Sequence, residues 1–335
     1  MASNPSAVPF VVRSADPWVR SSVTAEMLLQ LVEDGLLRPA DDRWRPEWMV
    51  PDDDEDEPHP PAGYVVSFVA FHERGLGMPA SRFMRALPHY YGVELHNFNP
   101  NSIAQAAIFA AVCEGYLGIA PHWDLWLHFF RADLFTRSLE KGVRQAVRAG
   151  GCSLQLRQRR SHQYIPAKLT SSNKGWHDGW FYLRNDDGGL PAYTGKVVSE
   201  RPDLWGWGVV KADQPRLDAL LEAMDRLRRH GVTAAGVVAA FHRRRVLPLM
   251  ARRLRLDEMT PEAPIDGSRM SSEILTTDEV FRRVKDTVEG VTDLGFLSQP
   301  PMRPTQGYVS LVSVRFVSLF YPLFLDSLIA SSVFS

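Results

Sequence analysis

Residues 63–131 constrain the fold more strongly than any other stretch of this 335-residue chain. The stretch is dense in aromatic side chains, and its glycines and prolines fall where helices would begin or end. It holds almost no consecutive charges, so most of its positions can be buried. This pattern predicts a compact helical core in which short turns join neighbouring helices.

Capping residues predict where the helices of this stretch lie. Ser81 precedes one helix, whose continuation Pro88 should limit. Asn99 is followed by proline, a combination typical of a helix start, and a further helix is expected to begin at Pro121. Ahead of them, the apolar run 64–71 with its β-branched valines favours a short strand, with a helix as the alternative.

The N-terminal side of the chain is expected to be simpler. Residues 1–20 should form a flexible arm. Thr24 can cap a first helix, which Gly35 would end in a left-handed conformation. A linker follows, and near residues 50–61 it contains the acidic run PDDDEDEP. Like charges repel each other and cannot be buried, so this run should be solvated.

The composition changes in residues 138–210. Clusters of glycine, serine, asparagine and aspartate separate short apolar runs such as CSLQL, GWFYLR and GKVVSE, which predicts a small antiparallel sheet. Residues 211–290 return to helical periodicity. We expect helices over 215–229, over 233–256 and after Thr277.

Together these segments predict a mainly α fold of the α+β kind, with a helical N-terminal module, a small antiparallel β section and a helical C-terminal part. The expected divisions are a flexible arm (1–20), a helical domain with the acidic linker (21–137), a small β-containing section (138–210), a basic helical section (211–290), and a loop with an apolar tail (291–335).

The tail over residues 309–335 raises the question of a membrane anchor. On an insertion scale, an aspartate near a helix centre costs about 2.5–3.5 kcal/mol, and each leucine or phenylalanine returns roughly 0.3–0.6 kcal/mol. The apolar side chains therefore barely offset Asp326, Pro322 and the serines. A buried strand or an aggregation-prone tail is the stronger interpretation, and a membrane partner is not expected.

Composition also bears on the class of function. The formal net charge of −1 argues against a uniformly basic nucleic-acid-binding surface, although charge can still gather locally. Cys113 and Cys152 show no CxxC or Cys/His spacing, and His72-Glu73 does not continue into an HExxH pattern. Ser, His and Asp are all present, but no G-x-S-x-G motif marks a nucleophile. The sequence therefore predicts neither a metal site nor a cofactor.

The strongest candidate for a binding site is a run of arginines between residues 216 and 256. This segment holds ten arginines against three acidic residues, and guanidinium groups suit phosphate oxygens. The candidate nucleic-acid-binding residues are Arg226, Arg228, Arg229, Arg243, Arg244, Arg245, Arg252, Arg253 and Arg255. A second basic stretch comprises Lys141, Arg144, Arg148, Arg157, Arg159 and Arg160. The alternative is that these side chains are solvated helix faces or partners of the acidic run.

Catalysis on DNA would need two or three carboxylates converging on metal ions. The middle region holds many acidic residues, namely Asp178, Asp186, Asp187, Asp203, Asp213 and Glu222. No alternating strand–helix pattern places them on a scaffold, and the run Asp186-Asp187-Gly-Gly is more readily a turn. The catalytic residues of such an enzyme would be unknown.

Several stretches are specific enough to indicate a family. They are FHERGLGMP and CEGYLGIAPHWDLW, accompanied by SSVTAEMLLQLVEDGLL, SSNKGWHDGWFYLRND, LPAYTGK and GVTAAGVVAAFHRRRVLPLMARR. With them, most of residues 20–260 resembles the plant gypsy-type transposon domain family, whose members are also labelled transposases. The resemblance implies a plant protein derived from a transposable element, a retrotransposon of the gypsy type. It supplies no catalytic triad. The apolar tail departs from the family, and we expect it to reflect truncation or intron read-through in the gene.

The resulting expectation is a non-catalytic interaction protein of the nucleus or cytoplasm, with a protein or a nucleic acid as its partner. One alternative is an element-encoded, metal-dependent enzyme of the transposase or integrase kind that acts on DNA. The other is a self-associating structural piece of an element polyprotein.

Overall fold

The structure is a computed structural model, and the part of the chain that it describes is not continuous. It covers residues 11–13, 15–34, 36–37, 46–78, 80–140, 143–167, 175–185, 188–198, 205 and 214–241. The helix expected after Thr277, the greater part of the one expected over 233–256 and the apolar tail lie outside these residues.

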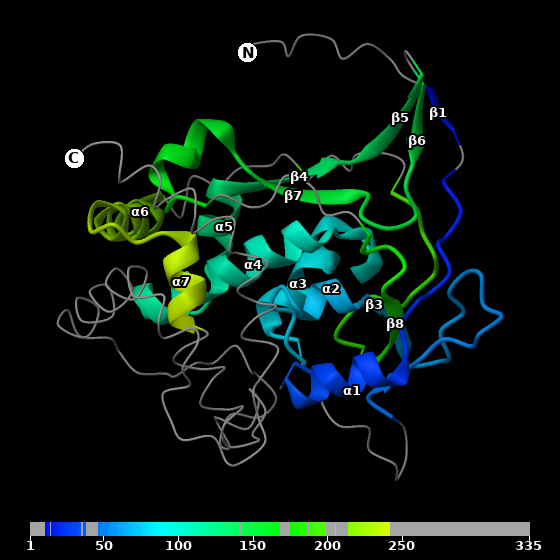
Figure 1. Cartoon of the computed structure of the whole chain (residues 1–335). Coiled ribbons are helices and arrows are strands. Elements are labelled where there is room, and N and C mark those ends of the chain that lie inside the picture. Colours follow the sequence, from blue (N-terminus) through cyan, green and yellow to red (C-terminus); the bar gives the residue numbers. More distant parts are fainter. Residues whose placement is uncertain are drawn as a thin grey trace, which may run out of the picture.

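Helices gather between residues 69 and 129 of the described chain, and a run of strands follows between residues 130 and 156 (Figure 1). The α-helices are α1 (Ala25–Glu33), α2 (Val69–His72), α3 (Arg82–Tyr91), α4 (Pro100–Val112), α5 (Trp123–Phe129), α6 (Gln214–Arg229) and α7 (Ala234–Phe241). Tighter or wider helical turns are η1 (Leu95–Asn97), η2 (Cys113–Leu117) and η3 (Gln158–Gln163). The strands are β1 (Val11–Arg13), β2 (Trp48–Met49), β3 (Tyr64–Phe68), β4 (Phe130–Leu134), β5 (Thr136–Glu140), β6 (Val143–Ala146), β7 (Cys152–Leu156) and β8 (Trp180–Arg184).

The strands form three small sheets. In the first, β8 lies between β2 and β3 and pairs antiparallel with both, with Phe68 opposite Trp180. In the second, β4 pairs antiparallel with β7. In the third, β6 lies between β5, which is antiparallel to it, and β1, which is parallel. Each sheet therefore joins segments that are distant in the sequence, and all three depend on residues beyond position 142.

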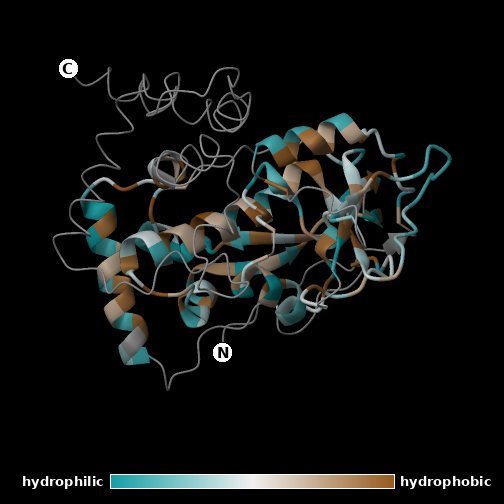
Figure 2. Cartoon of the chain, turned by 90° about the horizontal axis from the view of Figure 1, so that it is seen from below, coloured by the Kyte–Doolittle hydropathy of each residue, from teal (hydrophilic) through white to brown (hydrophobic). Residues whose placement is uncertain are grey.

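Helix α4 lies at the centre of the molecule, where it contacts α2 and α3 on one side and β7 on the other (Figure 1). Most of its side chains are alanine, isoleucine, phenylalanine and valine, and eight of its residues are buried. A helix that is apolar on nearly all sides has no solvent face and must be covered all round. In Figure 2 hydrophobic residues accordingly make up much of the central helices and strands.

Aromatic rings fill the space around α4. Trp126 stacks on Phe130 with ring centroids 4.1 Å apart, and Phe83 and Phe109 meet the same indole edge-on at 5.3 and 5.2 Å. The indole Nε1 donates to the hydroxyl oxygen of Tyr91 at 2.9 Å, which satisfies the polar atom of a side chain with no exposed surface. These contacts come from α3, α4, α5 and β4, so one aromatic cluster holds four elements together.

The predicted mainly α fold is wrong. Helices account for 41% and strands for 17% of the described residues, so strands make a larger part of the structure than one small β section. Strands also lie inside the module that was predicted to be helical, because β2 and β3 come between α1 and α2, and β4 follows directly on α5. One pair, β1 with β6, is parallel instead of antiparallel. The helical C-terminal part is described only over α6 and α7.

Several local predictions are confirmed. The hydroxyl of Thr24, the hydroxyl of Ser81 and the amide oxygen of Asn99 each accept a backbone N–H bond in the first turn of α1, α3 and α4. Strand β3 occupies most of the apolar run 64–71, β7 is the run CSLQL, and β8 lies in the run GWFYLR. In the described part of GKVVSE, residues 195–198, the chain forms no strand.

Other helix boundaries differ from those predicted. Pro88 does not limit α3, which continues through it to a left-handed Gly92. The helix predicted from Pro121 starts at Trp123, where His122 is the capping residue. Gly35, predicted to end α1, lies outside the described residues.

The acidic run is solvated but anchored. Most of its carboxylates are exposed, as predicted, on a loop that projects at the right of Figure 1 and is coloured hydrophilic in Figure 2. Tyr182 of β8 donates its hydroxyl to Glu55 at 2.8 Å and accepts the backbone N–H of His59 at the same distance. One buried strand therefore holds the loop at two points.

Candidate functional site

Histidines are candidates for acid–base chemistry, and among the described residues three of them, His72, His96 and His128, are buried. His96 is 1% exposed, and its Nε2 accepts a hydrogen bond from the side-chain amide of Asn97 at 3.0 Å. Its Nδ1 lies 3.4 Å from Glu94 Oε2. Burial lowers the pKa of His96 to about 3, so the ring is neutral near pH 7. Asn97 also donates to the carbonyl of Lys196.

Glu94 completes this polar cluster. Its carboxylate accepts the backbone N–H of Thr194 at 2.9 Å and the hydroxyl of the same residue. The cluster therefore fastens the irregular segment 188–198 to η1. Buried polar groups that satisfy one another hold a fold together. They are closed to any substrate.

A second buried histidine pairs with a serine. His72 Nε2 lies 3.0 Å from Ser67 Oγ, and both residues are 0% exposed. Burial lowers the pKa of His72 to about 4. The pair has the composition of a nucleophile and its base, but a reacting group must reach substrate. The pair was not predicted from the sequence, because its burial depends on the fold around β3 and α2 and no local motif marks it.

The cysteines are also interior groups. Cys113 and Cys152 are both fully buried. Burial raises the pKa of the Cys113 thiol to about 12 and raises that of Cys152 as well. Neutral, enclosed thiols behave as small apolar side chains.

Three of the predicted nucleic-acid-binding arginines lie in the last turns of α6. Arg226 pairs with Glu222 at 3.0 Å, and both Arg228 and Arg229 pair with Asp225. Partners three or four residues apart on a helix are typical of a solvated surface. The positive charge of this end of α6 is therefore largely balanced by its own acids. The remaining six candidates, Arg243, Arg244, Arg245, Arg252, Arg253 and Arg255, lie outside the described residues.

The second basic stretch divides into structural and exposed arginines. Arg157 donates its Nε to the carbonyls of Leu127 and Phe130, each at 3.1 Å, which pins the start of η3 to α5 and β4. Arg159 and Arg160 follow on η3 itself and are exposed. η3 also packs against α6. The sequence predicted this basic stretch, but it did not show which of its arginines are exposed to solvent.

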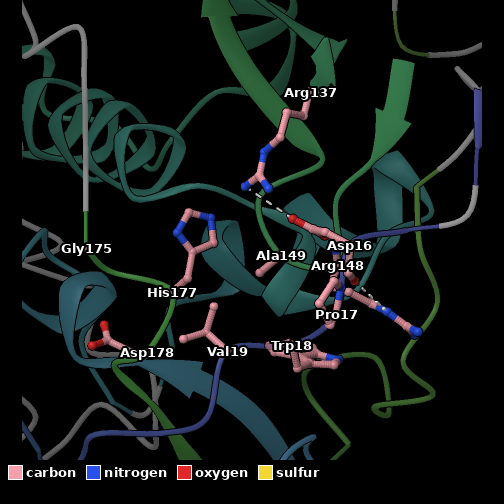
Figure 3. Close-up of a pocket in the computed structure, with 10 residues that line it drawn as sticks. All are labelled: Asp16, Pro17, Trp18, Val19, Arg137, Arg148, Ala149, Gly175, His177 and Asp178. Carbon is pink, nitrogen blue, oxygen red and sulfur yellow. Dashed lines mark hydrogen bonds and ion pairs between the residues drawn. The ribbon is translucent and has the colours of Figure 1, made fainter. Parts of the chain in front are cut away.

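A cavity of about 270 Å³ lies between the N-terminal segment, the base of the β5–β6 hairpin and the turn before β8 (Figure 3). The ionisable side chains in its lining are Asp16, Arg137, Arg148, His177 and Asp178. Figure 3 shows the imidazole of His177 and the guanidinium of Arg137 at the same space, with the carboxylate of Asp178 turned away from it. Sequence reasoning did not find this site, since its residues come from three distant segments.

Asp16 organises one wall of this cavity. Its Oδ1 accepts the backbone N–H of Arg148 at 3.0 Å, and its Oδ2 lies 3.3 Å from Arg137. The Nε of Arg148 donates to the backbone carbonyl of Asp16 at 3.2 Å. Burial lowers the pKa of His177, whose ring lies 4.1 Å from that of Trp176.

The described residues contain neither a metal-binding cluster nor a membrane-spanning helix. No three of their histidine, cysteine, aspartate or glutamate side chains come together in a metal-binding arrangement. None of their helices is both long and apolar enough to cross a bilayer. Of the acidic residues considered for catalysis, Glu222 pairs with Arg226 and Asp178 lies at the cavity, and the other four lie outside the described residues.

Comparison with known families identifies the segment around α4. Residues 65–134, from β3 to the end of β4, match a family described as "Putative gypsy type transposon". This segment is similar to a gypsy-type transposon domain. The matched segment contains the aromatic cluster and the Ser67–His72 pair, and it confirms the predicted family and the transposon-derived origin. No curated protein and no solved structure matches the chain.

Proposed function

We propose that this transposon-derived protein acts by binding and not by catalysis, and that its partner is nucleic acid held through its phosphates. The observation that carries the proposal is the surface of η3, on which Arg159, Arg160 and His162 are all exposed. A guanidinium presents several N–H donors in a planar fork that fits phosphate oxygens. This chemistry also suits the expected nucleus or cytoplasm.

The anchoring of η3 supports the same proposal. Arg157 fixes its start, and near its end His128 and Gln163 share a hydrogen bond of 2.9 Å between Nε2 and Oε1. A segment held at both ends loses little conformational freedom when its side chains bind a partner. By contrast, the potential acid–base groups His72 and His96 are enclosed and serve the fold.

Salt-dependent binding of labelled single- and double-stranded DNA and RNA, followed by fluorescence anisotropy, tests the proposal. Each phosphate contact contributes close to one unit to the slope of log affinity against log salt. We expect the double variant Arg159→Gln/Arg160→Gln to reduce that slope by about 2. The matched control is Arg226→Gln/Arg229→Gln, which removes two arginines that already have carboxylate partners, and it should change the slope less.

Three outcomes would redirect the proposal. Absence of binding at low salt would remove nucleic acid and leave a protein partner. An unchanged slope in the η3 variant, with a reduced slope in Arg243→Ala/Arg244→Ala/Arg245→Ala, would move the site to the predicted arginines beyond α7. Strand cleavage with added Mg²⁺ or Mn²⁺ would favour the enzyme of the transposase or integrase kind.

Self-association is the second candidate, and one observation favours it. Phe135 and Leu139 are 54% and 47% exposed at and beside β5, which is an edge strand of its sheet within the described chain. An exposed apolar edge strand readily pairs with another chain. Light scattering should then give a multiple of the 37.8 kDa chain mass. The variant Phe135→Ser/Leu139→Ser should return it to a monomer, and a monomeric wild type would exclude this candidate.

A further inference from the structure

The cavity beside Asp16 contains two polar side chains with unused donors. The guanidinium of Arg137 contacts a single acceptor among the described residues, Asp16 Oδ2, at 3.3 Å. Arginine has five N–H donors, so most of its hydrogen-bonding capacity remains available. The ring of His177 makes no hydrogen bond within the described chain, although it is half-buried and tilted against the ring of Trp176. Both groups face the same space (Figure 3).

The polar groups that line the cavity favour an anionic occupant. The carboxylate of Asp16 fixes Arg137 from one side and is itself held by the backbone N–H of Arg148. The carboxylate of Asp178 points away from the space (Figure 3), and the backbone carbonyl of that residue accepts two hydrogen bonds from Ser22. The groups that remain directed inward are therefore donors.

We propose that this cavity binds a phosphoryl group, with Arg137 and His177 as its direct donors and Asp16 as the residue that positions Arg137. A guanidinium fork matches two oxygens of a phosphate, and the imidazole N–H supplies a third contact. A volume of about 270 Å³ is larger than a phosphate ion needs, and Trp18 and Val19 extend the lining with apolar surface. A phosphorylated nucleoside or the phosphate of a nucleic-acid strand therefore fits better than the free ion.

The site contains no residue of η3, so its test is separate from that of the proposed function. Isothermal titration of the full chain at low salt would use four probes: inorganic phosphate, adenosine monophosphate, a single-stranded oligonucleotide and acetate. We expect adenosine monophosphate to bind more tightly than phosphate, and acetate to bind more weakly than both. Arg137→Gln should weaken binding about tenfold and His177→Gln by about threefold, since a tenfold change corresponds to the loss of one charge-assisted hydrogen bond.

Arg144→Gln is the matched control, because Arg144 is an exposed arginine on the adjacent strand β6 and does not line the cavity. It should change the affinity for adenosine monophosphate less than twofold. Circular dichroism of each variant shows that it remains folded, and the two single variants provide independent tests should one of them unfold.

The outcomes separate the sources of the phosphoryl group. Binding of adenosine monophosphate that depends on Arg137 supports a small-molecule site, whereas Arg137-dependent binding of the oligonucleotide alone supports the phosphate of a strand. Equal binding of acetate would overturn the assignment to phosphoryl groups. Equal losses in Arg137→Gln and Arg144→Gln, or no binding of any probe at millimolar concentration, would overturn the site itself.

Discussion

Acidification should destabilise this protein through the titration of His72. The ring is completely buried beside Ser67, and burial lowers its pKa from 6.5 to about 4. In the unfolded chain the ring regains its ordinary pKa of about 6.5. The unfolded state therefore binds more protons than the folded state between pH 6.5 and 4. The free energy of unfolding must fall as the pH falls through this window.

The size of the effect follows from the same values. At pH 5 the unfolded ring is almost fully protonated and the folded ring almost fully neutral, about 1.5 pH units below the unfolded pKa. Each unit corresponds to 1.36 kcal/mol, so the His72 contribution at pH 5 is about 2 kcal/mol. At pH 7.5 it is close to zero. Because domains are stable by about 5–15 kcal/mol in total, a loss of this size should be visible.

Urea unfolding of the wild type and of His72→Gln at pH 7.5 and pH 5 measures the difference. Carboxylates titrate in both proteins, so their contribution cancels in the comparison. We expect the wild type to lose about 2 kcal/mol more than the variant between the two pH values. His59→Gln is the control, because the side chain of His59 is 70% exposed and the variant keeps the buried His72 ring, so it should retain the loss that His72 causes.

An equal loss in the wild type and in His72→Gln would refute the reasoning. If the variant does not fold at pH 7.5, an NMR titration of the His72 ring in the wild type gives the same information. A ring that is protonated at pH 6 in the folded protein would show that burial does not control it.

Two further substitutions test packing and the acidic loop. Gly75→Ala should lower the free energy of unfolding by about 2–4 kcal/mol, because φ is +97° there and a Cβ would lie 2.8 Å from that of Ala107. Gly77→Ala has open space and should change the melting temperature far less. Tyr182→Phe removes the hydroxyl that holds Glu55 and should cost about 1–2 kcal/mol. It should also speed cleavage of the acidic loop by a glutamate-specific protease, and an unchanged cleavage rate would show that the loop is held elsewhere.

The sequence predicted the helix starts well because their causes are local. Thr24, Ser81 and Asn99 each satisfy a backbone N–H within three residues, so their role can be read without knowing the rest of the fold. The prediction that Pro88 would limit α3 was wrong, and the reason is also local. Pro88 lies seven residues into α3, yet the helix passes through it, and the burial of Leu87 and Tyr91 against the core outweighs the lost hydrogen bond.

The change from helix to strand at Phe130 could not be read from the sequence. Trp126, Phe129 and Phe130 continue an apolar helical stripe, and no glycine or proline follows them to mark an end. The chain becomes a strand there because β7 offers a partner, with Phe130 opposite Leu156. Pairing partners that are distant in sequence override local periodicity. The prediction of a mainly α fold failed at this point.

The cavity escaped prediction for the same reason. Asp16, Arg137 and His177 lie in three segments, and nothing in their local sequence indicates that they meet. The buried pair of Ser67 and His72 is closer in sequence, but its complete burial depends on β8, more than a hundred residues later. The family resemblance was confirmed over residues 65–134, where the sequence is most distinctive, and it carried no information about either site.

The position of β8 between β2 and β3 has a consequence for the folding of the chain during its synthesis on the ribosome. A nascent chain that has only reached residue 134 contains the whole family-matched segment, yet β3 has no partner and the ring of Phe68 has no Trp180 to face. The apolar edge of β3 stays unpaired until β8, which ends at Arg184, has emerged from the ribosome. Synthesis proceeds at roughly 5–20 residues per second, so this edge stays open for several seconds. The recognisable domain is therefore not the folding unit, and chaperone binding to ribosome-bound chains should peak between these two lengths.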